Sequence, residues 1–482
     1  MLPSNSRVLI IGIDSLETKF INNLINSKAS KGFSYFFEGG SSIPLRSTFP
    51  PDTLLAWPTI YTGLLPQRFG LKPEPESLLA LKINGYLIRN KLLNKTFWDI
   101  ASKSDKRVCI VNPIFAYPPW KVNGLMVTGP SFGLNGSTMS QPTRDDLLCY
   151  RLGTYGRTPL LPHEYKETLR EAVEQLKRIF SLAYKLFNED SYDIMFVADY
   201  TLDRIQHYYW RYCDPEDPLH PKFMNTFKDA IVNYYRVLDT IIWRFIDRFS
   251  DDYTVIVFGD HGHTRRPLRL ISIEKLLNPR IRGKYRHAEL FKHLAMLFAY
   301  YARIGNLSYW LIKKMQENGL LGRLMVKKHF DTTNKQAVRS IGEFGLKEFV
   351  GLKLPDGNKS EGFIDKIKKI LTSSGLAEVA FTPREYYGIA EPLEFEADLF
   401  VKLKEIGNLQ SSNSFFMLPN FTRRIISGGH SMFSVLLVYN SGKKIFFKTS
   451  FMRVQDVAPS ILSIAGLRSE IKFDGLNVIC HE

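Results

Sequence analysis

Four nearly continuous apolar runs divide the first part of the chain, and each is typical of a buried strand. They are RVLIIGI from Arg7 to Ile13, KRVCIV from Lys106 to Val111, YDIMFVA from Tyr192 to Ala198 and YTVIVF from Tyr253 to Phe258. Strands that are covered on both faces are rich in β-branched residues and lack polar alternation. We therefore expect these runs to form the centre of a parallel sheet.

Between these runs, apolar residues recur every three or four positions, which predicts long helices. One spans Glu164 to Phe187 and another Phe223 to Phe249. Strands that alternate with long helices predict an α/β fold with a doubly wound, mostly parallel sheet. Sites in such sheets form at the carboxyl ends of the strands, where Asp14, Asp203 and Asp260 fall.

The pattern changes after Asp260. Residues 268–330 are basic, aromatic and helical in pattern, whereas residues 335–425 hold short strand-like runs and charged turns. A strand at Ser434 to Tyr439 and a short helix at Val457 to Ala465 then return. With 482 residues, the chain is too long for one ordinary core. We predict a core of residues 1–267, an inserted cap of 268–426, and a C-terminal part of the core at 427–482.

Charge and cysteine content indicate the kind of ligand and the cellular compartment. The net charge of +16 favours anionic ligands without choosing among them. The four cysteines form no CxxC pair, which indicates a reducing compartment and no zinc finger. The first apolar run is too short for a signal peptide, and no run reaches about 18 apolar residues, the length of a membrane span. We expect a cytoplasmic protein without a membrane span; the oligomeric state is left open.

Several polar motifs offer candidate ligands, and each also has an ordinary structural interpretation. Asp203 and His207 stand at i and i+4, so on a helix they share one face. The adjacent Asp260 and His261 need an irregular turn to act together, which Gly262 permits. Taken singly, these could be an exposed pair and a strand-end turn. Likewise, Asp14 could cap a helix and His430 could lie in a loop.

Thr53 stands where TFPPD leads into an apolar run that can begin a helix. Either Asp52 or Thr53 could simply be the N-cap. A hydroxyl at a helix N-terminus also lies where anions bind, and the helix dipole favours its alkoxide. Together the motifs supply three carboxylates, three imidazoles and one hydroxyl without a thiolate. That donor set suits zinc and tolerates manganese, and two such ions can hold both oxygens of an in-line phosphoryl displacement.

The ordered motifs resemble a known family. They are RVLIIGID, FPPDTLLAWPTIYTGLLPQRFG, FAYPPWKVNGLMVTG, DRIQHYYW, VFGDHG, GGH and QDVAPSILSIAGL. In this order they resemble the type I phosphodiesterase/nucleotide pyrophosphatase proteins of the alkaline phosphatase superfamily. The resemblance implies an alkaline phosphatase-like fold.

The same resemblance implies the roles of the residues. One metal ion would be held by Asp203, His207 and His430. The other would be held by Asp14, Asp260 and His261, with Thr53 bridging to it as the nucleophile. The chain departs from the family pattern at Leu55 and Phe69, where Pro and His are common. The residues His263, Arg265 and Arg266 give the ligand turn a basic exit that either binds phosphate or is solvated.

These features predict hydrolysis of a phosphodiester or pyrophosphate of nucleotide type through a threonyl-phosphate intermediate. The main alternative is a phosphomonoesterase, which the ligand set does not separate. A formylglycine sulfatase is disfavoured because Cys-x-Pro-x-Arg is absent, and a phosphoglycerate mutase would show a serine nucleophile. From another class, a non-catalytic binder of nucleic acid or anionic surfaces would use the basic aromatic segment 284–314. We expect small phosphoester substrates and no stable nucleic-acid complex.

Overall fold

A computed structural model describes residues 7–71, 85–130, 136–153, 158–159, 161–266, 269–270, 338–344, 349–355, 359–375, 377–389, 393, 395, 397–404, 418–419 and 425–481. The chain divides into two compact units. The first, the core unit, comprises Met1–Lys72, Glu76–Thr264 and His430–Glu482; the second comprises Pro73–Pro75 and Arg265–Gly429. The covering role predicted for residues 268–426 stays a prediction.

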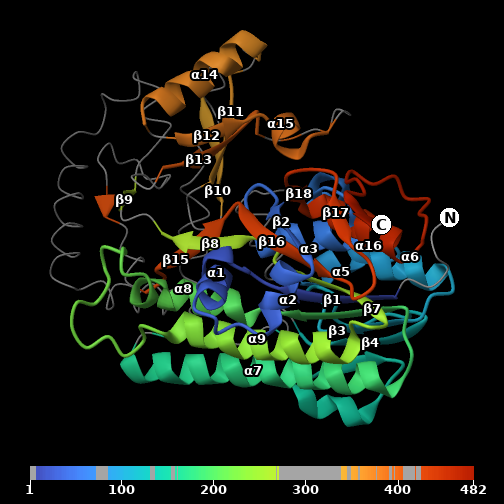
Figure 1. Ribbon diagram of the computed structural model, residues 1–482. Coiled ribbons are helices and arrows are strands. Elements are labelled where there is room, and N and C mark those ends of the chain that lie inside the picture. The colour runs from blue at the N-terminus through green and yellow to red at the C-terminus, as the bar shows by residue number, and fades with distance from the viewer. Residues whose placement is uncertain are drawn as a thin grey trace. The chain divides into compact units, whose positions relative to one another are not determined.

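A mixed sheet forms the centre of the core unit (Figure 1). Its strands, in spatial order, are β18 (Met452–Arg453), β2 (Ser41–Arg46), β16 (Phe433–Tyr439), β7 (Tyr253–Phe258), β1 (Arg7–Ile13), β6 (Ile194–Asp199), β3 (Val108–Val111), β4 (Gly124–Thr128) and β5 (Met139–Gln141). The run from β7 to β4 is parallel, whereas β16 and β5 pair antiparallel to their neighbours. The predicted α/β class with a mostly parallel sheet is confirmed.

Helices cover both faces of this sheet. On one face lie α3 (Thr53–Thr62), α5 (Gly85–Leu92), α6 (Phe97–Lys103) and α16 (Val457–Ile464). On the other lie α1 (Thr18–Asn26), α2 (Gly32–Glu38), α7 (Pro162–Glu189), α8 (Thr201–Cys213) and α9 (Ala230–Phe249), with α7 and α9 side by side (Figure 1). In β1, Val8 and Ile10 pack into the hydrophobic core that contains α3, and Leu9 and Ile11 pack into the core that contains α7 and α9. The sheet is therefore doubly wound, and β1 is apolar on both faces because both are buried.

Short elements complete the core unit. They are the 3-10 turns η1 (Pro66–Phe69), η2 (Asp145–Tyr150) and η5 (Val454–Asp456), the pair β17 (Ile445–Phe447) and β19 (Ile479–His481), and the pair β8 (Gly262–Arg265) and β15 (Gly428–Ser431). The last pair carries the chain out of the core unit and back into it. Among the helices of the described ranges, none has an apolar stretch long enough to span a bilayer.

The second unit contains a small antiparallel sheet. Its order is β10 (Arg339–Phe344), β11 (Phe349–Lys353), β13 (Leu399–Leu403) and β12 (Ala377–Phe381). The helix α14 (Glu361–Ser373) packs Ile367 and Leu371 into the core of this sheet. The unit also holds α15 (Pro383–Tyr387) and the pair β9 (Arg269–Leu270) and β14 (Leu418–Pro419). The segment 284–314, to which we assigned a possible binding role, lies outside the described residues.

One predicted boundary is wrong. We expected a helix from Phe223, but α9 begins at Ala230. The Asn225 side chain accepts a hydrogen bond from Phe227 N (3.2 Å) and donates one to Tyr212 O (2.7 Å). These bonds hold the chain in a turn before the helix, and they leave Phe223 exposed.

Candidate metal centre

Asp14 directly follows β1, whose neighbours in the sheet are β6 and β7. Its backbone N–H donates to Asp199 O (2.9 Å), which extends the pairing of β1 with β6 by one residue. Its carboxylate is buried, and Oδ2 accepts a hydrogen bond from Trp57 Nε1 at 3.4 Å. The indole lies this close because Gly12 has no side chain: a Cβ there would lie 2.5 Å from Trp57 Cη2.

The first turn of α8 presents Asp203, with His207 one turn later. The Asp199 carboxylate accepts from Thr201 N (3.1 Å), which satisfies a free amide at the start of the helix. As the i, i+4 spacing predicted, Asp203 and His207 share one helix face, with Asp203 Oδ2 3.2 Å from His207 Nε2. The pair therefore points a carboxylate and an imidazole toward one region.

The turn after β7 brings Asp260 and His261 together. His261 Nδ1 lies 3.0 Å from Gly262 O, so this nitrogen donates and Nε2 keeps its lone pair. His261 Nε2 lies 3.5 Å from Asp260 Oδ2 and 3.4 Å from Asp14 Oδ1. Glycine is needed at 262, because a Cβ there would lie 2.0 Å from Phe433 O. The two adjacent side chains thus converge, as the predicted irregular turn requires.

His430, in β15, reaches the same region from the C-terminal part of the core unit. Its Nδ1 donates to Pro51 O at 2.7 Å, which leaves Nε2 free to act as a ligand. Nε2 lies 3.1 Å from His207 Nε2 and 3.4 Å from Asp203 Oδ1. Its ring stacks on that of His261, with centroids 3.9 Å apart.

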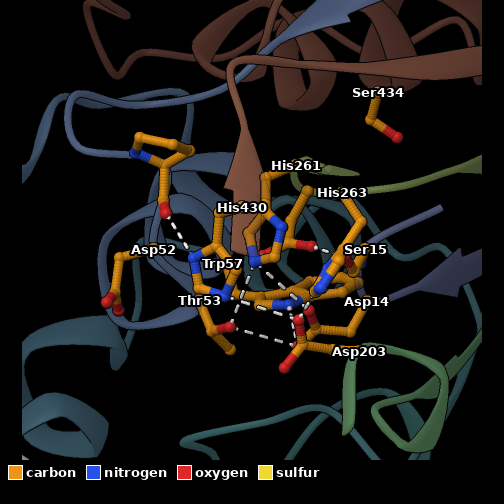
Figure 2. Close-up of polar contacts among 12 residues, drawn as sticks. Asp14, Ser15, Asp52, Thr53, Trp57, Asp203, His261, His263, His430 and Ser434 are labelled. Carbon is orange, nitrogen blue, oxygen red and sulfur yellow. Dashed lines mark hydrogen bonds and ion pairs between the residues drawn. The ribbon is translucent and has the colours of Figure 1, made fainter. Parts of the chain in front are cut away.

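Thr53 is the first residue of α3, and Asp52 is its N-cap. The Asp52 carboxylate accepts from Leu54 N (2.9 Å), so Thr53 Oγ1 is not used in capping. This hydroxyl lies 3.3 Å from Asp14 Oδ2 and 3.4 Å from His261 Nε2. Figure 2 shows the side chains of Thr53, His261 and His430 turned toward those of Asp14 and Asp203.

The donor atoms fit a pair of metal ions. Tetrahedral sites with zinc–ligand bonds of about 2.0–2.1 Å place neighbouring ligand atoms about 3.3–3.4 Å apart. The separations above run from 3.1 Å, between His207 and His430, to 3.5 Å, between His261 and Asp260. Within the described ranges, three buried carboxylate oxygens find no hydrogen-bond partner: Asp14 Oδ1, Asp203 Oδ1 and Asp260 Oδ2. Buried acceptors are rarely left this way unless a cation satisfies them.

Possible three-residue ligand groups overlap at Asp203 and at His261. Asp14, Asp260 and His261 form one group, which is the set that the resemblance implies for one metal ion. Asp203 joins His261 and His430 in a second group, and His207 and His263 in a third. The set implied for the other ion (Asp203, His207 and His430) therefore lies together, and His263 lies beside it.

Burial and like charge set the protonation of these groups in the absence of metal. Burial raises the pKa of Asp14 well above its usual range, and the nearby Asp260 adds to the effect. Burial likewise raises the pKa of Asp260 to about 7. For His430, burial lowers the pKa, but the nearby Asp203 carboxylate outweighs this effect and raises the pKa to about 9. Burial lowers the pKa of His261 well below its usual range.

Three residues that we singled out lie in a hydrophobic core or in the second unit, and a fourth, His263, is buried beside the centre. Leu55 and Phe69, which depart from the family pattern, are both buried in the hydrophobic core beside α3. Arg266 is buried in the second unit, where it donates to Ile426 O (3.2 Å). His263 is not a solvated basic residue but a buried, uncharged one, because burial lowers its pKa to about 3.

Other residues of the centre escaped the sequence analysis. Ser15 and Trp57 contact the candidate ligand residues Asp260 and Asp14, respectively, through N–H groups. Ser15 lies just after the RVLIIGID motif and shows no recognisable signal in the sequence. Trp57 stands four residues after Thr53 within the second motif, but that spacing alone gave it no role. The left-handed φ of Ser15 (66°) is not visible in the sequence.

Comparison with known proteins gives solved structures of low sequence identity. Human ectonucleotide pyrophosphatase/phosphodiesterase 5 is 12% identical, with 98% of this chain and 97% of that chain covered and a TM-score of 0.48. Phosphonoacetate hydrolase from Sinorhizobium meliloti 1021, solved with phosphonoformate, is 14% identical, with 96% and 97% covered and a TM-score of 0.49. A search of curated proteins finds no match.

A family model also matches this chain. The model of the family described as type I phosphodiesterase / nucleotide pyrophosphatase matches residues 8–306, more than half of the chain. The match includes Asp14, Thr53, Asp203, His207, Asp260 and His261, all of which the structure brings to one centre. This chain belongs to the type I phosphodiesterase/nucleotide pyrophosphatase family and is a phosphoester hydrolase of the two-metal kind.

Proposed function

We propose that the chain hydrolyses phosphodiester or pyrophosphate bonds of nucleotide-type substrates, with Thr53 as the nucleophile. The observation that carries this proposal is the position of Thr53 Oγ1, 3.3 Å from Asp14 and 3.4 Å from His261 at the start of α3. The family description supports the substrate class.

In the proposed reaction, Thr53 Oγ1 attacks phosphorus, a P–Oγ1 bond forms and the bond to the leaving oxygen breaks. Water then cleaves the threonyl-phosphate ester, which restores the hydroxyl and releases the phosphorylated product. The N-terminus of α3 favours negative charge on Oγ1 and on the phosphoryl group beside it. The side chains of Asp14 and His261 hold Oγ1 in place for attack.

Two groups of residues would hold the metal ions: Asp203, His207 and His430 for one, and Asp14, Asp260, His261 and Thr53 for the other. When bound, the ions supply Lewis-acid stabilisation of the attacking and leaving oxygens. Zinc is our proposal for their identity, because the donors are nitrogen and oxygen atoms at tetrahedral spacing. Manganese shares much of this chemistry. The cytoplasmic location also stays a proposal, which the free thiols of all four cysteines suit.

Two measurements on the purified protein test the proposal. One is its metal content, and the other is its turnover of the diester bis-p-nitrophenyl phosphate and of the monoester p-nitrophenyl phosphate. We expect two metal ions per chain and faster turnover of the diester. A faster monoester reaction would favour a phosphomonoesterase. Neither metal nor turnover of either ester would instead support an anionic-ligand or nucleic-acid binder.

A further inference from the structure

Ser15 contacts two other segments of the centre through all its polar atoms. Its N–H donates to Asp260 Oδ1 (3.1 Å), and its carbonyl accepts from Gln206 Nε2 on α8 (2.6 Å). Its hydroxyl lies 3.3 Å from Gly262 O and 2.7 Å from His263 Nδ1. Ser15 is fully buried and has a left-handed φ of 66°, an unusual backbone for a residue with a side chain.

His263 connects Ser15 to Asp203 and His207. It is 2% exposed, and its backbone N–H donates to Glu17 Oε2 (2.9 Å), which fixes the position of the residue. Its Nδ1, bonded to Ser15 Oγ, also lies 3.5 Å from Asp203 Oδ1. Its ring packs edge-on to that of His207, with centroids 4.6 Å apart.

One proton assignment satisfies both contacts of the serine hydroxyl. Ser15 Oγ–H donates to Gly262 O, and His263 Nδ1–H donates to Ser15 Oγ. The Nδ1 proton then also faces the Asp203 carboxylate, an attractive electrostatic arrangement. The orientation of metal ligands commonly depends on hydrogen bonds from residues that do not themselves contact the metal.

We propose that Ser15 and His263 are positioning residues that act as a pair. Together they hold the two candidate ligand groups, one with Asp260 and one with Asp203 and His207, at a fixed distance from each other. Ser15 fixes Asp260 on one side, and His263 fixes Asp203 and His207 on the other. This role rests on the two-metal function proposed above. It predicts that loss of either member weakens metal binding even though the ligands themselves remain.

Four variants isolate the pair. Ser15→Gly removes the hydroxyl but tolerates the left-handed backbone, so the N–H and carbonyl contacts stay. His263→Ala removes the ring, whereas His263→Asn places an amide nitrogen near the position of Nδ1. Ser434→Ala is the matched control: it removes another buried serine hydroxyl that bonds the same loop, at Leu16 O (2.7 Å), without contact to a ligand residue.

Zinc affinity, measured by competition with a chromophoric chelator, is the readout, and melting temperature in excess zinc checks the fold. We expect Ser15→Gly and His263→Ala each to weaken binding of the more weakly held ion by about 10–100-fold. His263→Asn should recover part of the loss, and Ser434→Ala should bind zinc like the wild type. Ser15→Gly combined with His263→Ala should be no worse than the worse single variant, because both remove one interaction.

Unchanged zinc affinity in both Ser15→Gly and His263→Ala would overturn the pair, as would losses that multiply in the double variant. Should His263→Ala not fold, Ser15→Gly and His263→Asn still decide the question. A wild-type protein that binds no zinc and no manganese would instead refute the proposed function. The two failures are therefore distinguishable.

Discussion

His430 Nδ1 lies 2.7 Å from the carbonyl oxygen of Pro51, so a histidine near the C-terminus is anchored to the segment that precedes Thr53. The hydrogen bond fixes the tautomer of His430 and aims its Nε2 at Asp203 and His207. It also ties β15 to the approach to α3. A candidate ligand and the candidate nucleophile are thus positioned by one contact, although its two ends are 379 positions apart in the sequence.

Thr53→Ala should abolish most turnover while metal content and melting temperature stay near those of the wild type. The hydroxyl is the atom that would bond phosphorus, so we expect a loss of at least about a thousand-fold in kcat/KM. Thr53→Ser keeps a hydroxyl and should retain part of the activity. Steady-state kinetics on bis-p-nitrophenyl phosphate measures both, and normal turnover by Thr53→Ala would remove Thr53 from the mechanism.

Chelation should inactivate the protein, and zinc or manganese should restore it. Asp260→Ala and His261→Ala should each lose about one metal ion per chain and nearly all activity, because they share one ligand group. Elemental analysis of dialysed protein measures the stoichiometry. Gln175→Ala is a useful control, since it removes a buried polar side chain from α7 that bonds Gly153 O, outside the centre. Two ions retained in both ligand variants would refute the ligand assignment.

The sequence predicted the parts of the fold that local pattern determines. β1 and β7 occupy the predicted residues because a strand covered on both faces is apolar throughout. β2 was missed because SSIPLR contains a proline and begins with two serines, of which Ser42 is exposed. The pairing of Ser15 with His263 joins positions 248 residues apart, and no periodicity in the sequence reports such a contact.

Trp57→Phe should slow turnover without unfolding the protein. The change removes the indole N–H that donates to Asp14 Oδ2 but keeps an aromatic ring in the core. Losses of about 10–100-fold are usual when a hydrogen bond that orients a metal ligand is removed. Zinc affinity and kcat/KM measure the effect, and values equal to those of the wild type would show that the indole N–H has no orienting role.

Gly12→Ala tests the same contact from the other side. The added Cβ would lie 2.5 Å from Trp57 Cη2, so the indole or β1 must shift. Overpacking of this kind costs about 1–3 kcal/mol. Denaturant unfolding measures the free energy of unfolding, and Gly362→Ala serves as the control, because no atom of a described residue would lie within 4 Å of its added Cβ. Equal stability of Gly12→Ala and the wild type would contradict the close approach.

Replacing residues 284–314 should alter substrate choice more than chemistry, if the insertion acts as a cap. We expect a changed KM for large diesters and a nearly unchanged rate on a small activated ester, because remote contacts select the substrate. Kinetics on a dinucleoside diester and on bis-p-nitrophenyl phosphate make the comparison. Equal losses on both, with metal still bound, would show that the insertion is structural.

The metal-free protein should lose stability as pH rises from 7 to 9. The pKa of His430 is about 9 in the folded protein, above its ordinary value, so its contribution is full below about 6.5 and lost as pH rises through 9. Asp260, with its pKa raised to about 7, has lost most of its own contribution by the start of this window. His261 and His263, whose pKa values are lowered, oppose this slope only near pH 7, where unfolded histidines still bind some protons, and add nothing above about pH 8.

Zinc binding has the opposite dependence, because the ion displaces the proton of His430 and needs the neutral ring. The gain in melting temperature on adding zinc should therefore widen between pH 7 and 9. Melting curves with chelator and with zinc at pH 7, 8 and 9 measure both trends. His430→Gln, which has no proton to lose, should flatten the slope of the chelated protein. A chelated wild-type protein that gains stability over this range would contradict the proposed environment of His430, since only a lowered pKa gives that sign.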